Sequence, residues 1–369
     1  MAELNLFEEA NRQLIICNAC RYCEGFCPVF RAIETRRDFA QGDVLYLANL
    51  CHDCRACYYS CMFTPPHEFA VNIPQILSEA RISSYQRWSW PALLGRAFKN
   101  RGVTVFLALA VVAAVAVAAL VLIPSDRLFA AHLGPGAFYD VVPYLAMVIP
   151  AIVLFFYGIF LWIQGSVRSW SETGGTPPGT EGVKAVFRAI GAAFGARYLK
   201  GGGPGCYYPG ENPSGIRRVY HNLVVWGFLF DFASTTLAFI YQDFLHLIPP
   251  YSVTSAPVVF GTVGGVALVI GTIGLISIKL RSDRTPAGEG AYGMDYVFLV
   301  ILCLTALSGL LLLSLRTTPA LGSLLVLHLA LVAALFATAP YGKFVHAVYR
   351  TEALVRYYAE QGSQPATHD

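Results

Sequence analysis

Two short segments near the start of the chain contain eight of its ten cysteines. Residues 17–28 read CNACRYCEGFCP and residues 51–61 read CHDCRACYYSC, so both have the spacing C-x2-C-x2-C-x3-C. In bacterial two-cluster ferredoxins this spacing supplies the four thiolates that each [4Fe–4S] cluster needs, and the fourth cysteine of each run binds the other cluster. Pro28 follows the fourth cysteine of the first segment, as in that signature. The sequence therefore predicts two [4Fe–4S] clusters.

The crossed pattern divides the eight cysteines into two sets, each drawn from both segments. The first set is Cys17, Cys20, Cys23 and Cys61, and the second set is Cys51, Cys54, Cys57 and Cys27. Zinc and disulfides are the alternatives. Structural zinc sites pair two C-x2-C knuckles, which would leave surplus cysteines in each segment. Disulfide-rich domains are secreted, whereas the opening residues MAELNLFEEANRQ lack the apolar core of a signal peptide.

The residues around the two segments indicate helices rather than strands. Residues 28–50 show no period-two alternation of apolar and polar side chains. Asp43 is a candidate N-cap for a helix that runs into the second segment. We therefore predict an all-α fold whose N-terminal domain, residues 1–80, is a helical ferredoxin-like domain.

Most of the remaining chain is apolar enough to lie in a membrane. The chain is 56% hydrophobic and 13% charged, against about 25% charged in soluble domains. Because a helix of about 20 apolar residues crosses a bilayer, we predict a six-helix transmembrane bundle within residues 103–350. The predicted spans are 103–123, 141–163, 219–241, 257–278, 295–314 and 321–342.

Lysine and arginine predict the orientation of the spans. Seventeen of these residues flank the spans on the side of the N-terminus, and two lie on the opposite side. Because positive residues are enriched in cytoplasmic loops, we expect both termini, the cysteine segments and the long connection 164–218 in the cytoplasm. Within this scheme, residues 81–102 are a linker along the membrane surface, 183–200 an interfacial helix, and 351–369 a polar tail. The net charge of +3 and the lack of a basic stripe argue against nucleic-acid binding.

Two histidines are candidate axial ligands of a b-type haem. His221 lies three residues inside the third span, and His346 lies at the same depth if the sixth helix continues beyond Pro340. Axial ligands must face each other across one iron, which requires equal depth on neighbouring helices. His328 precedes His346 by 18 residues, about 27 Å along a helix. It is therefore a candidate ligand for a second haem only, and otherwise we expect it to pair with Asp231.

Three stretches resemble a known family. FEEANRQLIICNACRYCEGFCPVF, YLANLCHDCRACYYSCMFTPPHEFAVNIPQ and PYGKFVHAVYR are similar to the tricarballylate-utilisation protein B family, also called citrate-utilisation protein B. The resemblance implies a protein of the bacterial inner membrane with two [4Fe–4S] clusters and haem b. It also implies that the electrons come from a separate FAD-dependent enzyme, tricarballylate dehydrogenase, and pass to quinone. That dehydrogenase oxidises tricarballylate to cis-aconitate.

The membrane half also resembles the cytochrome b subunit of respiratory nitrate reductase. In that pattern, two histidines 18 residues apart lie on one helix. Each of them pairs with a histidine on another helix, and these two partner histidines are ten residues apart. His221 matches the first of these partners, whereas Asp231 takes the place of the second. The resemblance therefore implies one haem near the cytoplasm.

The sequence thus predicts an electron carrier that has no flavin fingerprint of its own, so quinone reduction is the one reaction that it would itself carry out. His52 is expected to tune a cluster, and Cys206 to be a packed thiol. Two alternatives remain open. The chain could serve a different dehydrogenase or a thiol–disulfide reductase, or it could transport tricarboxylates. For a transporter, however, no arginine lies mid-span to bind the substrate.

Overall fold

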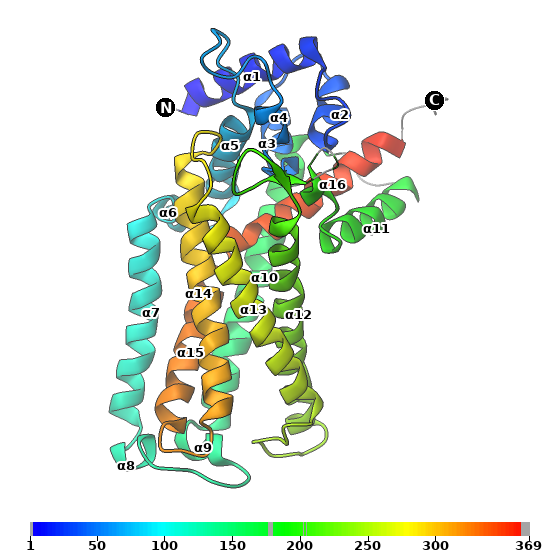
Figure 1. Cartoon of the computed structure of the whole chain (residues 1–369). Helices are drawn as coiled ribbons and strands as arrows, with labels where there is room; N and C mark the ends of the chain where they lie inside the picture. Colours follow the sequence, from blue (N-terminus) through cyan, green and yellow to red (C-terminus); the bar gives the residue numbers. More distant parts are fainter. Residues whose placement is uncertain (1–2, 176–179, 202, 204, 363–369) are drawn as a thin grey trace.

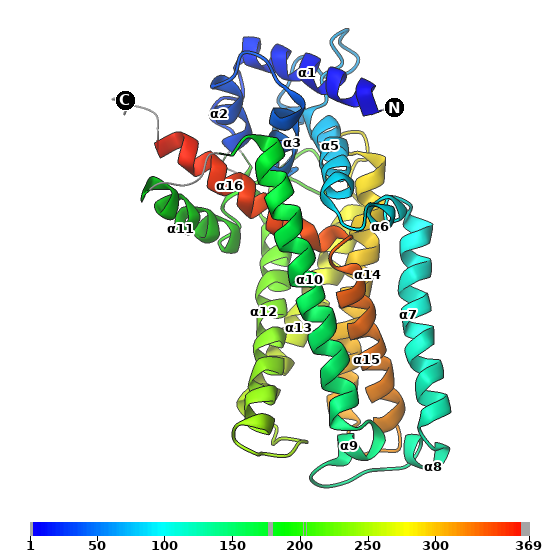
Figure 2. The same cartoon turned by 180° about the vertical axis from the view of Figure 1, so that it is seen from behind.

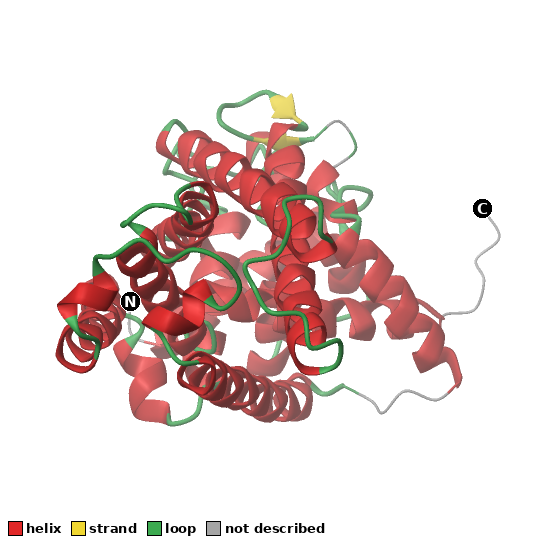
Figure 3. Ribbon diagram, turned by 90° about the horizontal axis from the view of Figure 1, so that it is seen from below, coloured by secondary structure: helices red, strands yellow, loops and turns green. Residues whose placement is uncertain are grey.

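The computed structural model describes residues 3–175, 180–201, 203 and 205–362, and these are almost entirely helical (Figure 3). Within this part of the chain the sole sheet is a hairpin, in which β1 (Cys206–Tyr207) pairs antiparallel with β2 (Pro213–Ser214). An N-terminal domain lies at one end of a bundle of long helices (Figure 1). The prediction of an all-α fold is confirmed.

The N-terminal domain is built from short helices, and the cysteine segments lie at their ends. The helix that leads into the second segment is α3 (Gln41–Leu50), which begins earlier than predicted, with Ala40 as its N-cap. Asp43 lies in the first turn instead and pairs with Arg36 at 2.8 Å, so the prediction that it caps this helix is wrong. The helices are α1 (Glu3–Cys20), α2 (Pro28–Glu34), α3 (Gln41–Leu50), α4 (Ala56–Tyr59), α5 (Ile73–Trp88) and α6 (Ala92–Ala97).

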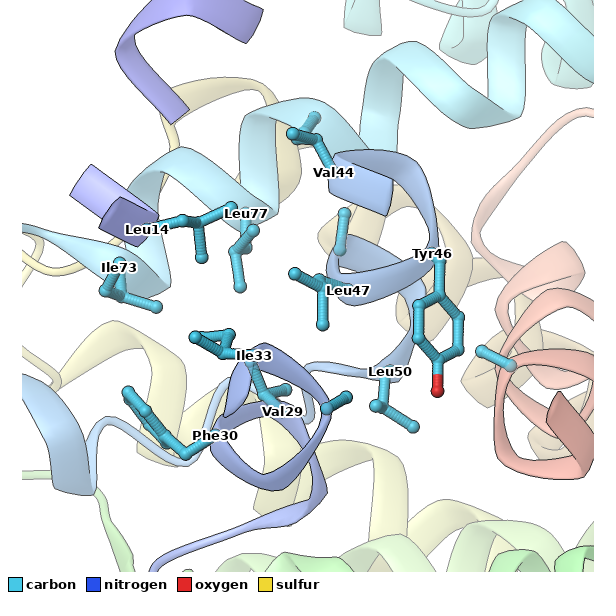
Figure 4. Close-up of a cluster of buried hydrophobic side chains, with 14 of the residues drawn as sticks. Leu14, Val29, Phe30, Ile33, Val44, Tyr46, Leu47, Leu50, Ile73 and Leu77 are labelled. Atoms are coloured by element: carbon cyan, nitrogen blue, oxygen red, sulfur yellow. The ribbon is translucent and has the colours of Figure 1, made fainter. Parts of the chain in front are cut away.

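A compact apolar core holds these helices together. Leu14 of α1, Ile33 of α2, Leu47 of α3 and Leu77 of α5 are buried against one another (Figure 4). Burying a leucine or isoleucine side chain contributes about 1.5–3 kcal/mol. The core therefore fixes α1, α2 and α3, whose ends carry cysteines, against α5.

Within the described residues, six helices are long and apolar enough to cross a membrane, as predicted. Large apolar side chains such as Phe106 and Phe156 are exposed on the outside of the bundle, as expected where lipid is the solvent. We conclude that this is a multi-pass membrane protein. The spanning helices are α7 (Arg101–Leu122), α10 (Tyr144–Thr173), α12 (Ile216–Asp243), α13 (Ala256–Leu280), α14 (Glu289–Ser314) and α15 (Leu321–Thr338).

The closest packing in the bundle is between α12 and α13. A side chain at Gly264 would collide with the backbone carbonyl of Gly227, and one at Gly274 would collide with the ring of Tyr220. Small residues let two membrane helices approach closely in this way. The approach fixes the rotation of α12, on which Tyr220 precedes His221.

The end of the sixth span and the C-terminal segment that follows it differ from the prediction. The sixth spanning helix ends at Thr338 rather than 342, and a new helix, α16 (His346–Gly362), follows the short η2 (Lys343–Val345). Figures 1 and 2 show α16 crossing the end of the bundle beneath the N-terminal domain. Leu354 and Tyr357 belong to the domain core. The predicted polar tail is therefore helical through Gly362, because one face of it is apolar, and residues 363–369 lie outside the described part.

The long connection between α10 and α12 contains α11 (Thr180–Phe194) and η1 (Arg197–Lys200). Ala185 and Ala189 of α11 are buried, whereas Val183 and Phe187 are exposed, and α11 packs against α16 (Figure 1). The predicted interfacial helix therefore ends at Phe194 rather than at residue 200, and it presents apolar side chains outward, as such a helix does towards lipid. The opposite end of the bundle is closed by α8 (Ser125–Leu128) and α9 (Ala137–Val141).

Candidate metal centres

The sulfur atoms of the first set gather around one cavity. All four of its cysteines line this cavity, together with apolar side chains that include Tyr22, Phe30 and Met62. The first three cysteines come from the end of α1 and the turn that follows, whereas the fourth comes from the end of the second segment. The fold thus brings the first set together across the two segments, as the crossed pattern predicts.

The second set is also brought together, and it is buried more deeply. Burial raises the pKa of the Cys57 thiol well above its usual range, and the neighbouring Cys54, Cys27 and Cys51 raise it further. Cys27 is the N-cap of α2 and Cys51 the C-cap of α3, so both lie at fixed helix ends. Four such thiols ionise together only when a strong positive charge such as bound iron compensates them.

The backbone of both segments adopts conformations that are rare for side-chain-bearing residues. Arg21, Asp53 and Arg55 have φ angles of 56°, 51° and 65°, and non-glycine residues in this region cluster at functional sites. Backbone N–H groups also point at sulfur: Asp53 N donates to Cys51 Sγ at 3.5 Å and Phe63 N donates to Cys61 Sγ at 3.3 Å. Hydrogen bonds to the sulfurs tune iron–sulfur clusters.

The donor chemistry of both sets fits iron–sulfur clusters. The four thiols of the first set line one cavity, and in the second set Cys54, Cys27 and Cys51 lie close enough to Cys57 to raise the pKa of its thiol. Among the residues that the structure describes, no three His, Cys, Asp or Glu side chains converge closely enough for a single metal ion. Nδ1 of His52 bonds to the carbonyl oxygen of Leu50 at 2.8 Å, which fixes the orientation of this ring within the second segment.

Two arginines of the membrane half bind the backbone of the second segment. Arg217 of α12 donates to the carbonyl oxygens of His52 and Asp53, at 3.0 and 2.6 Å. Arg350 of α16 donates to the carbonyl oxygen of Cys51 at 2.8 Å. We call Arg217 and Arg350 the arginine pair. They attach the second segment directly to the end of the bundle.

Further contacts enclose the second segment. Tyr208 donates to Asp53 Oδ2 at 2.7 Å, and Tyr207 N donates to the carbonyl oxygen of Cys54 at 2.9 Å, so the hairpin covers this segment. Cys206, also on the hairpin, is fully buried and donates to the carbonyl oxygen of Leu199 at 3.1 Å. It is a packed thiol, as expected from the sequence.

The two histidines predicted as axial ligands face each other below the arginine pair. The ring centroids of His221 and His346 are 6.4 Å apart and the rings are inclined by 77°. Metal–imidazole bonds are about 2.0–2.1 Å long, so two rings that share one metal atom have centroids roughly 6 Å apart. The spacing of this histidine pair therefore fits a shared iron.

The free nitrogens of the histidine pair support the same reading. Nδ1 of His346 donates to the carbonyl oxygen of Lys343 at 2.6 Å, which leaves Nε2 with its lone pair, and such second hydrogen bonds orient metal-binding histidines. Burial and the charge of Arg350 lower the pKa of His346, so its ring is neutral. Nδ1 of His221 is buried without a hydrogen-bond partner among the described residues.

The route by which the fold places His346 differs from the prediction. It does not extend the sixth spanning helix but begins α16, because the chain turns after Thr338. Asp295 of α14 anchors this turn through Lys343 Nζ at 2.7 Å and Lys279 Nζ at 2.5 Å. The depth of His346 therefore depends on an ion-paired turn.

His328 lies apart from the histidine pair. Its Nδ1 shares a hydrogen bond with Ser308 of α14 at 3.0 Å, and Asp231 lies instead against Gly264 of α13. The predicted pairing of His328 with Asp231 is wrong, because the two residues face different neighbouring helices. His328 remains a candidate ligand only by its residue type.

The arginine pair was missed by the sequence reading, although a signal for it is present. RRVYH places Arg217 four residues before His221, and HAVYR places Arg350 four residues after His346. Residues four apart lie on the same face of a helix. One helix therefore carries Arg-x3-His and the other His-x3-Arg. This pattern predicts that the two histidines pair with each other and that the two arginines pair one helical turn away.

Comparison with known proteins gives independent evidence of the family to which the chain is related. The family model described as citrate utilization protein B matches residues 97–367, and the model described as its Fer4-like domain matches residues 10–87. Citrate utilization protein B of Escherichia coli is 38% identical over 357 residues, which cover 96% of this chain and 92% of the relative. No solved structure matches.

Proposed function

The chain belongs to the citrate utilization protein B family, and from this premise we propose that it is an electron carrier of the bacterial inner membrane. It accepts electrons from a cytoplasmic FAD-dependent dehydrogenase, for which tricarballylate dehydrogenase is the candidate implied by the resemblance, and delivers them to quinone. Two [4Fe–4S] clusters and haem b supply the one-electron chemistry when bound.

The observation that carries this proposal is the attachment of the second cysteine set to the histidine pair. Arg217 lies one helical turn before His221, and Arg350 lies one turn after His346. Both arginines reach the backbone around Cys51. The same two helices that hold the candidate haem ligands therefore hold the second set at a fixed position, as efficient electron transfer between two centres requires.

The first set supplies the entry for electrons in this proposal. Cys20 is exposed, and Tyr22 and Met62 beside it are 62% and 68% exposed. They belong to the N-terminal domain, which lies at one end of the bundle (Figure 1). A soluble donor can approach this surface closely, and the predicted cytoplasmic orientation would expose it to such a donor.

The chain's own residues hold and orient the centres. The two sets of cysteines provide the cluster ligands, and His221 and His346 provide the axial nitrogens. The carbonyl oxygen of Lys343 fixes the tautomer and the ring orientation of His346. Asp295 fixes Lys343 in turn. His346 thus rests on a second group that keeps its ring in place.

Absorption and EPR spectra of the anaerobically purified chain test the haem ligands. We expect a low-spin b-type haem and two clusters in the native protein. His221→Ala and His346→Ala should each abolish the haem spectrum and keep both clusters, whereas the matched variant His328→Ala should keep the haem. Loss of haem in His328→Ala alone would overturn the ligand assignment, and a native preparation free of iron would overturn the whole proposal.

The donor is tested by isolating the native protein from its own membranes. Co-purification of a flavoprotein that reduces the clusters with tricarballylate would identify the expected partner. A different flavoprotein or a thiol–disulfide reductase in the same role would change the partner and keep the electron-transfer function.

A further inference from the structure

The second set lies among positively charged side chains. Arg55 and Arg81 are 1% and 5% exposed, and Arg81 Nε donates to the carbonyl oxygen of Ala48 at 2.7 Å, one turn before the second segment. The arginine pair adds two more guanidinium groups on the side of the bundle. Four arginines from α12, α16, α5 and the second segment itself therefore lie around this segment, and Arg81 and Arg350 lie beside Cys51.

Few negative charges balance these arginines. Asp53 lies within the second segment and pairs with Arg55 at 3.9 Å. Asp283 lies at the surface, where its carbonyl oxygen accepts from Arg55 at 2.8 Å. Asp295 is already shared between two lysines. Positive charge is therefore in excess around the second set.

The first set has a different electrostatic environment. Arg21, which lies between Cys20 and Cys23, and Arg31 are both exposed. Two carboxylates, Glu24 and Glu34, lie close to these arginines. Water screens exposed charges, and the opposite signs largely cancel. The first set therefore gains little from the charges around it.

Reduction adds one negative charge to a cluster, so buried positive charge nearby stabilises the reduced form and raises the reduction potential. We propose that the arginine pair raises the potential of the centre at the second set above that of the centre at the first set. This inference rests on the proposed electron-transfer function and deepens it. Electrons that enter at the exposed first set would then move inward, towards the histidine pair.

Of these four arginines, the arginine pair is linked both to the second set and to the histidine pair. Its guanidinium groups bind carbonyl oxygens of the second segment, and its backbone belongs to the helices of His221 and His346. The pair therefore lies between the second set and the histidine pair. These arginines touch no reacting atom, so they are positioning residues that act through their charge.

EPR-monitored redox titration of the purified full chain tests the inference. Arg217→Gln and Arg350→Gln should each lower the potential of one cluster by about 59 mV, a tenfold change in its one-electron reduction constant, and leave the other cluster unchanged. Arg21→Gln is the matched control, since it removes an exposed guanidinium beside the first set. It should shift neither potential by more than about a third of that amount.

Two further variants keep the test decisive if the glutamine variants fail to assemble a cluster. Arg217→Lys keeps the charge and loses the two-oxygen geometry, so it should retain the native potential. Asp53→Asn removes the negative charge within the second segment, so it should raise the same potential that the glutamine variants lower. Equal shifts of both clusters, or a lowered potential in Arg217→Lys, would show that the arginines act by structure alone.

The order of the native potentials separates this inference from the proposed function. If both clusters are present but the centre at the first set has the higher potential, the inference is overturned and the electron-transfer function stands. If the purified chain contains no cluster, the proposed function itself fails.

Discussion

The two cysteine segments have the same spacing in the sequence, but the two sets drawn from them have opposite surroundings in the fold. The first set opens onto solvent beside Tyr22 and Met62, which are 62% and 68% exposed. The second set is enclosed by the hairpin and bound through its backbone by Arg217 and Arg350. The same spacing of cysteines is therefore placed in two environments: the first set is open to solvent, and the second is bound to the membrane half.

The largest expected effect comes from breaking the crossed ligand pattern. Cys61→Ser should remove the same cluster as Cys20→Ser, and Cys27→Ser the same cluster as Cys54→Ser, because each set draws on both segments. Every one of these variants should lose about half of the cluster iron. Iron analysis with EPR on anaerobic protein measures this loss. The assignment fails if Cys61→Ser instead removes the cluster that Cys54→Ser removes.

Exposure should make the two centres differ in their resistance to oxidation. When the purified protein is treated with ferricyanide, we expect the EPR signal lost in Cys20→Ser to decay several-fold faster than the signal lost in Cys54→Ser. The reason is that Cys20 is exposed, whereas the hairpin covers Cys54. Equal decay of the two signals would contradict the contrast between an open and an enclosed set.

The smallest effect concerns the hydrogen bond that closes the hairpin over the second segment. Tyr208→Phe removes the donor to Asp53 Oδ2 and leaves a buried carboxylate oxygen unsatisfied, at a cost of about 1–3 kcal/mol. Tyr22→Phe, at an exposed ring beside the first set, should change stability by less than about 0.5 kcal/mol. Denaturant titration of the solubilised protein, followed by loss of cluster absorbance, compares the two variants. A larger loss in Tyr22→Phe would be inconsistent with an enclosed second segment.

Local patterns sufficed for the spanning helices and for the helical character of the N-terminal domain. Apolar length alone places a helix such as α7 or α13 in a membrane, because each residue contributes separately to transfer into lipid. The same local reading failed at Asp43 and at the end of the sixth span. At those places an ion pair and a turn anchored by Asp295 decide the outcome, and both depend on residues distant in the sequence.

The cysteine spacing, the apolar spans and the two histidines can be found from the order of the residues, since these are properties of residue type and interval. The folded arrangement is needed to show that the C-terminal segment is a helix in the domain core, that His328 bonds to Ser308, and that the arginine pair binds the second segment. Arg350 and Cys51 are about three hundred residues apart. Contacts over such separations form only when packing brings helix ends together, and no local pattern contains that information.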